Sequence, residues 1–334
     1  MKKKFFSITL IFAIMLLFVS VPASAESEKY DYRGMLLYTI NDSKTAITIT
    51  NSDLYSTSIA IPEKINGIPV TTIAQGAFSG RTNLKQVSIP DSVTSIGSSA
   101  FEYCKNISRI VLPKNLQTIG RFAFEGCTNL EYINIPNKVT LIDAYAFSYC
   151  SNLSSITIPD SVMTVGSGAF DYCTNLKNVT IGKGVKKFGV SPFDDNSVIP
   201  DNVFFNCNNL SYISVDAENK VYCSLDGNLF NKNKTELLQY ARGRLNTEYS
   251  IPASVIKIHS SAFNNSTNLR NITIPNGVKA IGSFSGCVNL ESIDIPDSVT
   301  SVNSNLAQSF YNCKNLTDIK IGNGIKEISY QMFK

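Results

Sequence analysis

The chain of 334 residues has few charged side chains and a single histidine, His259. Asp, Glu, Lys and Arg together make up 17% of the sequence, and the formal net charge is +4. Lys2, Lys3 and Lys4 lie in a segment that we expect to be removed, which leaves a nearly neutral chain. Binding to nucleic acid or to an anionic membrane requires Lys and Arg clustered on one face. We therefore expect no nucleic-acid partner, and no membrane partner after cleavage.

Sequence motifs for phosphate or metal binding are also missing. The chain has no glycine-rich phosphate loop, no Cys/His spacing typical of zinc sites and no complete EF-hand loop. A cysteine nucleophile with a histidine base would have to combine Cys223 with His259, and no third group is indicated that would orient the histidine. We expect no cofactor, no bound metal and no enzymatic activity; a hydrolase that uses Cys223 and His259 is the outside alternative.

The sequence is organised by a repeat. The frame Phe-x-x-Cys-x-Asn-Leu-x-x-Ile-x-Ile-Pro-x-x-Val-x-x-Ile recurs along most of the chain, with a period of 23 residues between Phe78, Phe101, Phe124, Phe147 and Phe170. A period of roughly 20–29 residues with an L-x-x-I-x-I core is typical of a leucine-rich-repeat solenoid, whose units bury their apolar edges by stacking. We predict an α/β solenoid with a parallel β-sheet on its concave face, short helical turns on its convex face and an N-terminal β-hairpin cap.

Two positions of the repeat form columns along the solenoid. Seven of the eight cysteines stand three residues after a repeat phenylalanine: Cys104, Cys127, Cys150, Cys173, Cys207, Cys287 and Cys313. Other copies carry Arg81 or Ser266 at this position, so we predict reduced, buried packing residues rather than disulfides. An asparagine such as Asn106 or Asn129 precedes each strand and is predicted to hydrogen-bond turn backbone groups of its own and of the neighbouring coil.

The first 25 residues have the pattern of a secretory signal. Three lysines are followed by an apolar run from Phe5 to Val21 and by the small residues Ala23-Ser24-Ala25, which predicts cleavage after Ala25. The alternative is an uncleaved membrane anchor, because the apolar run is at the short limit of what spans a bilayer. We predict a secreted or cell-surface protein.

The mature chain is divided into a cap and a solenoid. Residues 26–77 are predicted to form the N-terminal β cap and the first half repeat, and residues 78–334 the solenoid, with insertions at about 189–202 and 216–249. The first insertion predicts a loop on the convex side, and the second, with its Asp226-Gly227 turn, predicts a hairpin or three-stranded flap. Because the repeat stops at Phe333-Lys334, we expect self-association through an uncapped C-terminal coil.

The repeat frame AF-x-x-C-x-NL-x-x-I-x-IP-x-x-V-x-x-IG, the hairpin that ends in INGIPVTTIAQGAF and the insertion from Tyr222 to Tyr240 resemble the BspA-like leucine-rich repeat family of exported bacterial proteins. The resemblance covers nearly all of the mature chain. It implies cell-surface adhesion and binding of host or matrix proteins, and it carries over no defined binding residues.

The candidate binding surface is the concave sheet. Residues that flank the second apolar position of each strand are expected to face solvent, and most of them are short and polar. Tyrosines on such a surface are expected to dominate recognition, because they offer a large ring and a hydroxyl. The candidate binding residues are Arg109, Tyr132, Asn134, Asn178, Tyr212 and Asn271. A protein partner is the favoured ligand, and a surface glycan is the alternative.

Overall fold

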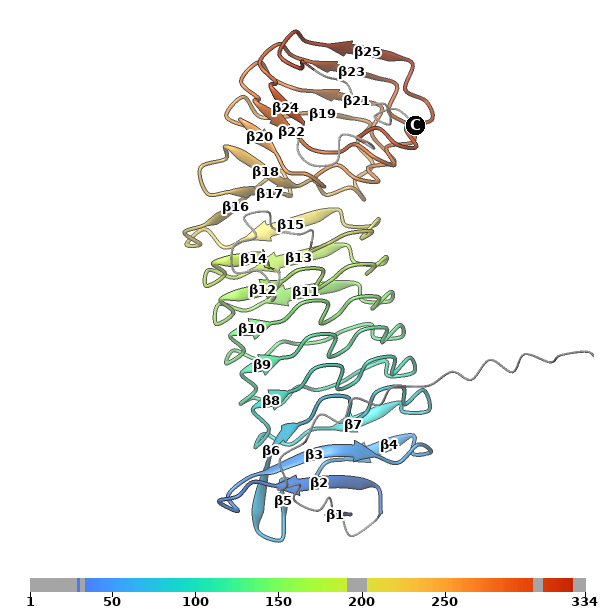
Figure 1. The fold of residues 1–334 in the computed structure, drawn as a ribbon, viewed down its shortest axis with the longest axis vertical. Helices are drawn as coiled ribbons and strands as arrows, with labels where there is room; N and C mark the ends of the chain where they lie inside the picture. Colours follow the sequence, from blue (N-terminus) through green and yellow to red (C-terminus); the bar gives the residue numbers. More distant parts are fainter. Residues whose placement is uncertain (1–28, 31–33, 191–202, 303–308, 327–334) are drawn as a thin grey trace, which may run out of the picture.

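The computed structural model describes residues 29–30, 34–190, 203–302 and 309–326. It is a β-solenoid whose coils stack along one long axis, from the N-terminal strands at one end to β25 (Asp318–Ile321) at the other (Figure 1). The predicted signal segment and residues 191–202 of the first predicted insertion lie outside the described residues. Gly189 and Val190, which the sequence assigns to that insertion, belong to strand β14 (Lys187–Val190).

The L-x-x-I-x-I segments form the predicted parallel sheet, which we call the front sheet. Along each strand apolar residues point into the core and polar residues face solvent, as the burial of Asn178, Val179, Thr180 and Ile181 shows. Isolated bridges Ser88↔Val111 and Arg109↔Tyr132 continue the pairing where no full strand forms. The strands of the front sheet are β4 (Ser58–Ala60), β7 (Gln86–Ser88), β11 (Ser155–Ile158), β13 (Asn178–Ile181), β15 (Tyr212–Val215), β19 (Glu248–Ser250), β21 (Asn271–Thr273), β23 (Ser292–Ile295) and β25. They pair in three groups, β4-β7, β11-β13-β15 and β19-β21-β23-β25.

A second parallel sheet, the return sheet, runs along the other side of the solenoid and was not predicted as a sheet. The sequence indicates only that Val93, Ile96 and their counterparts point inward on the return path. Ile96 and Ile119 are indeed buried, but the residues before them also pair between coils. Its repeated members are β6 (Ile68–Ile73), β8 (Ser95–Ile96), β9 (Thr118–Ile119), β10 (Leu141–Ile142), β12 (Thr164–Gly166), β14, β20 (Lys257–Ile258), β22 (Ala280–Ile281) and β24 (Ser301–Val302). The strands from β6 to β14 pair in one group and those from β20 to β24 in another.

The prediction of short helical turns is wrong for the described residues, which contain no helix. The segments 97–103, 120–126, 143–149 and 166–172, which we call the turn wall, join the return sheet to the next front strand. Ser99 and Tyr103 both have a positive φ, near 55°, which an α-helix cannot accommodate. The amides of Ser99, Phe101 and Tyr103 instead donate to carbonyls of the next coil at 2.6–2.8 Å. Accordingly, no helix in the described part of the chain is long and apolar enough to cross a membrane.

The repeat phenylalanines and cysteines fill the core as two columns. Rings from Phe78 to Phe204 stack coil on coil with centroids 4.9–5.9 Å apart. Each column cysteine is a free thiol that donates to the carbonyl of the preceding coil's phenylalanine, with Sγ···O distances of 3.0–3.2 Å. Six of the seven are fully buried and Cys313 is half-buried, which confirms the packing role.

The asparagine column forms the predicted ladder. Asn106 Nδ2 donates to Thr82 O of the preceding coil at 2.7 Å, and Asn129 Nδ2 donates to Asn106 Oδ1 at 3.3 Å. The Asn106 amide therefore donates to a turn carbonyl of the preceding coil and accepts from the Asn129 amide of the following coil, at the exposed edge of the solenoid.

The N-terminal cap is a hairpin, as predicted. Strand β2 (Leu36–Ile40) pairs antiparallel with β3 (Ile47–Ser52), and β3 then pairs in parallel with β6 of the first coil. Asn41 Oδ1 closes the connecting loop by accepting from the amides of Thr45 and Ala46. Two short strands complete the cap: β1 (Lys29–Tyr30) on β2 and β5 (Lys64–Ile65) on β6.

The second insertion is a three-stranded flap, also as predicted. Strands β16 (Tyr222–Leu225), β17 (Asn228–Asn231) and β18 (Glu236–Gln239) are antiparallel, and β18 then pairs in parallel with β20. The buried core is divided at this point into one cluster that ends at Leu229 and another that begins at Phe230.

Candidate functional site

Four of the six predicted binding residues lie in one exposed row that crosses the strands of the front sheet. Arg109 pairs with Tyr132 across a bridge, and Asn178 pairs in register with Tyr212 on the next strand. Ser155 stands between the two pairs, because β11 and β13 place Ser155 opposite Asn178. The 23-residue period returns Arg109, Tyr132, Ser155 and Asn178 to the same face, whereas Tyr212 follows Asn178 by 34 residues and joins the row because β15 pairs with β13.

Tyr132 and Tyr212 are the large apolar side chains of this row, with 55% and 53% of their surface exposed. They lie three strands apart, which corresponds to about 14 Å at the usual spacing between strands. The spacing allows one ligand to contact both rings. Tyr212 also lies against the flap: a Cβ at Gly227 would meet its ring carbon Cδ2 at 2.8 Å, and the amide of Ile213 donates to Gly227 O.

The remaining two predicted residues occupy different places. Asn134 is exposed two residues after Tyr132 and lies on the same face, in the next row. Asn271 lies on β21, in the β19-β21-β23-β25 group of front strands, which does not pair with β15. The structure therefore does not bring Asn271 into the tyrosine row, because the tip of the flap takes the position of the next front strand after β15.

Asn271 instead borders a hollow of about 490 Å³ on the exposed face of the β19-β21-β23-β25 group. Ser292 Oγ donates to Asn271 Oδ1 at 3.0 Å, and Lys320 Nζ stands 3.9 Å from Asp294 Oδ2. Asp297 also lines the hollow. Sequence reasoning placed Ser292, Asp294 and Lys320 on the exposed face but gave no sign that the surface is hollowed there.

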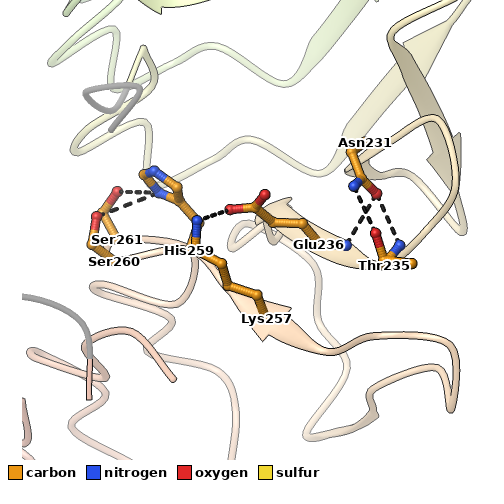
Figure 2. A network of polar contacts seen from close by, with 7 residues as sticks. All are labelled: Asn231, Thr235, Glu236, Lys257, His259, Ser260 and Ser261. Atoms are coloured by element: carbon orange, nitrogen blue, oxygen red, sulfur yellow. Dashed lines mark hydrogen bonds and ion pairs between the residues drawn. The ribbon is translucent and has the colours of Figure 1, made fainter. Parts of the chain in front are cut away.

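The outside alternative, a Cys–His pair, finds no support in the geometry of the thiol. Cys223 Sγ donates to the carbonyls of Asn231 and Lys232 at 3.2 and 3.6 Å. Burial raises the pKa of the Cys223 thiol, which opposes formation of the reactive thiolate. His259 is buried beside the hydroxyls of Ser260 and Ser261, each 3.5 Å from Nδ1 (Figure 2).

The same view shows how the flap joins the following coil. Asn231 Oδ1 accepts from the amides of Thr235 and Glu236, and Glu236 forms an ion pair with Lys257 at 2.6 Å (Figure 2). These contacts hold the loop of the flap in place and are structural in kind. In the described part of the chain, no group of three or more His, Cys, Asp or Glu side chains is placed to hold a metal ion.

The fold and its exposed rows define the class: a leucine-rich-repeat solenoid with a polar front sheet and tyrosines upon it. The BspA type leucine rich repeat region matches residues 71–199 and 239–334, in six copies. The chain belongs to this family.

Solved structures with the same fold come from several bacteria. A leucine rich cell surface protein from Faecalibacterium prausnitzii is 25% identical, with 89% of this chain and 95% of that chain covered and a TM-score of 0.56. The pneumococcal vaccine antigen PcpA is 20% identical, with coverages of 90% and 82% and a TM-score of 0.61. A leucine-rich repeat protein from Eubacterium ventriosum is 21% identical, with coverages of 90% and 92% and a TM-score of 0.52. A comparison with curated proteins found no match.

Proposed function

We propose that this chain is an exported interaction protein, displayed at the cell surface or secreted, that binds a partner protein on its front sheet. The single observation that carries the proposal is the exposed row with Arg109, Tyr132, Asn178 and Tyr212 in register. Two half-exposed rings supply contact area, and the short polar residues between them supply hydrogen bonds at small entropic cost. The likeness to the F. prausnitzii cell surface protein and the secretory pattern of residues 1–25 support the location.

The test is a binding screen against a panel of extracellular-matrix proteins, followed by variants. Burial of one tyrosine ring contributes roughly 1.5–3 kcal/mol, so Tyr132→Ala should weaken binding about tenfold or more. Tyr132→Phe keeps the ring and should lose much less. Because Tyr212 also contacts Gly227, Tyr212→Ala is judged only after its thermal unfolding matches that of the parent.

One outcome would move recognition elsewhere. If binding survives the double change of Tyr132 and Tyr212 to alanine but disappears when residues 223–244 are replaced by a short linker, the flap carries recognition. A panel in which no protein binds, even at the highest concentration tested, contradicts the proposal.

A glycan is the second candidate ligand, and the hollow near Asn271 favours it. Asn271, Thr273, Ser292 and Asp294 offer amide, hydroxyl and carboxylate groups around a depression of about 490 Å³. Such a donor and acceptor set matches sugar hydroxyls. A glycan array tests this reading: a hit that is abolished by Asp294→Ala and unaffected by Tyr132→Ala would assign the hollow, while an array without hits would exclude it.

A further inference from the structure

The turn wall carries a second set of exposed aromatic side chains, in a different segment of each coil from the front strand. The residue before the column cysteine is a tyrosine in three coils of this wall, Tyr103, Tyr149 and Tyr172, each with φ between 55° and 58°. Other coils place Gly126, or an asparagine such as Asn206, at this position. A left-handed conformation costs a residue with a side chain roughly 1–2 kcal/mol, and a bulky one is rarely found there.

The rings lie over the outer surface of the wall. A Cβ at Gly126 would overlap the Tyr103 ring, so this ring covers the Gly126 backbone and keeps its other side open to solvent. Tyr149 stacks on Tyr172 with centroids 4.3 Å apart and planes within 7°. Tyr103 and Tyr149 remain 45% and 44% exposed.

Two carboxylates accompany the rings. Glu102 and Glu125 precede Tyr103 and Gly126 in the sequence, so they occupy equivalent positions of neighbouring coils. The two side chains share a hydrogen bond, and burial together with the charge of Glu102 raises the pKa of Glu125 to about 7. Glu125 and Glu102 also raise the pKa of the Tyr103 hydroxyl, because both carboxylates lie close to it.

We call Glu102, Tyr103, Glu125 and Tyr149 the turn-wall site. We propose that the turn-wall site binds arginine or lysine side chains of an extended basic segment in a partner protein. The faces of the rings attract a cation, and the neighbouring carboxylates complement its charge. The site lies on a different wall from the front-sheet row, so it holds independently of the proposed function.

The wall already contains one instance of the interaction that we propose. Arg121 places its guanidinium carbon 4.5 Å from the centroid of the Phe122 ring, whose other neighbour is the stacked ring of Tyr145. Arg121 also lowers the pKa of Glu125, against the larger effects of burial and Glu102. A guanidinium therefore fits on an aromatic ring of this wall next to the same carboxylate.

The spacing of the rings suggests the form of the bound segment. Tyr103 and Tyr149 are two coils apart, which corresponds to about 10 Å at the usual spacing of paired strands. In a polyproline II helix, residues i and i+3 point the same way and lie about 9 Å apart. A segment with basic residues three positions apart thus presents one cation to each ring.

The experiment uses the mature chain and a fluorescent peptide in which single arginines alternate with two prolines. The control peptide has glutamine in place of each arginine. Fluorescence anisotropy in low-salt buffer should show binding of the arginine peptide alone, and added salt should weaken it. A peptide that binds no better than its glutamine control overturns the proposal.

The decisive variants replace the rings with a residue that this position already accepts. Tyr103→Asn and Tyr149→Asn should fold, since Asn206, Asn265 and Asn312 occupy the equivalent position with positive φ. Each loss of a ring should weaken binding about threefold, and the double variant about tenfold. Glu102→Gln with Glu125→Gln should weaken it at least as much, whereas Tyr55→Ala, at an exposed tyrosine of the cap outside both proposed sites, should have no effect. Unchanged binding in the asparagine double variant, with thermal unfolding at or above that of the parent, would refute a role for the rings.

Discussion

Arg242 is a charged residue buried in the core, and replacing it by methionine tests whether a buried guanidinium without hydrogen-bond partners destabilises the fold. Its side chain is 1% exposed, and none of its three guanidinium nitrogens has a hydrogen-bond partner among the described residues. Burial lowers the pKa of Arg242, while Cys207, Cys287 and Asp171 nearby act in the opposite direction. Arginine remains charged in proteins, so the core holds a cation whose hydration is only partly replaced.

The expected change in the free energy of unfolding depends on the buried charge that methionine removes and on the packing that it keeps. An unsatisfied buried donor costs about 1–3 kcal/mol, and replacing buried ionic groups by apolar side chains of similar volume is often neutral or stabilising by about 1–4 kcal/mol. Methionine fills a similar elongated space with flexible, apolar atoms. We expect Arg242→Met to increase the free energy of unfolding by roughly 1–4 kcal/mol.

Arg81 supplies a matched control. It stands at a column-cysteine position, and its guanidinium donates to Asn51 Oδ1, to Ser79 O, and to the hydroxyl and carbonyl oxygens of Ser52, at 2.6–3.1 Å. Arg81→Met should therefore destabilise the chain by about 2 kcal/mol or more, because hydrogen bonds to a charged group are lost and buried acceptors are left without a donor. Urea unfolding followed by circular dichroism measures both. If both variants lose stability to the same extent, the Arg242 guanidinium has partners equivalent to those of Arg81, and the reasoning is refuted.

Three further predictions concern the pH, the thiols and the seam of the core. The pKa of Glu125 is raised to about 7 from 4.5, so the folded chain binds this proton more tightly than the unfolded chain does. The free energy of unfolding should therefore fall as pH rises from about 4.5 to 7, by about 1 kcal/mol after allowance for solvent screening of this half-exposed group. Urea titrations at pH 5 and 8 should show this loss in the parent and not in Glu125→Gln. A maleimide should label Cys223 in the native protein and Cys150 only after denaturation, as mass spectrometry would show; native labelling of Cys150 contradicts its burial. Phe147→Ala and Phe263→Ala should each lower the free energy of unfolding by about 3–5 kcal/mol. If the two core clusters open separately, amide hydrogen exchange should speed up in the half of the chain that contains the substitution and not in the other half.

Those parts of the fold that depend only on the period could be predicted from the sequence. The 23-residue spacing places Phe101 above Phe78 and Cys127 above Cys104, and the alternation along each strand decides which residues face solvent. Stacking and alternation recur in every coil, so one copy of the repeat predicts which residues stack and which face solvent in all of them. The part of the row from Arg109 to Asn178 follows for the same reason, whereas Tyr212 follows Asn178 by 34 residues and is located only by the return of the repeat motif after the first insertion.

The turn wall could not be predicted in this way, because its conformation is decided by neighbouring coils and not by local propensity. The stretch Gly97-Ser98-Ser99-Ala100-Phe101 is compatible with a short helical turn when read alone. In the stack, every second amide finds a carbonyl in the next coil, and satisfying these donors compensates for left-handed residues such as Ser99. The return sheet escaped prediction for a similar reason: two-residue strands such as Ser95–Ile96 have too little sequence to show alternation.

The flap separates Asn271 from the tyrosine row, and the sequence contains a sign of this in the loop of the flap. The loop of the flap repeats the loop of the cap: Asn231 and Asn41 each accept two backbone amides and donate to a threonine hydroxyl four residues later, and Lys234 and Lys44 share a positive φ. In each hairpin the second strand then begins a parallel sheet, β3 with β6 and β18 with β20.

The flap is therefore better understood as a second beginning of the solenoid than as a lid over the first. A coil needs a covered apolar end on which to stack, and a hairpin provides it wherever it occurs in the chain. This explains why the buried core divides between Leu229 and Phe230, within one strand of the flap. It also explains why the front face carries two unlike surfaces, because the turn at Gly227 ends the tyrosine row on β15 and the polar hollow belongs to the sheet that starts afresh with β19.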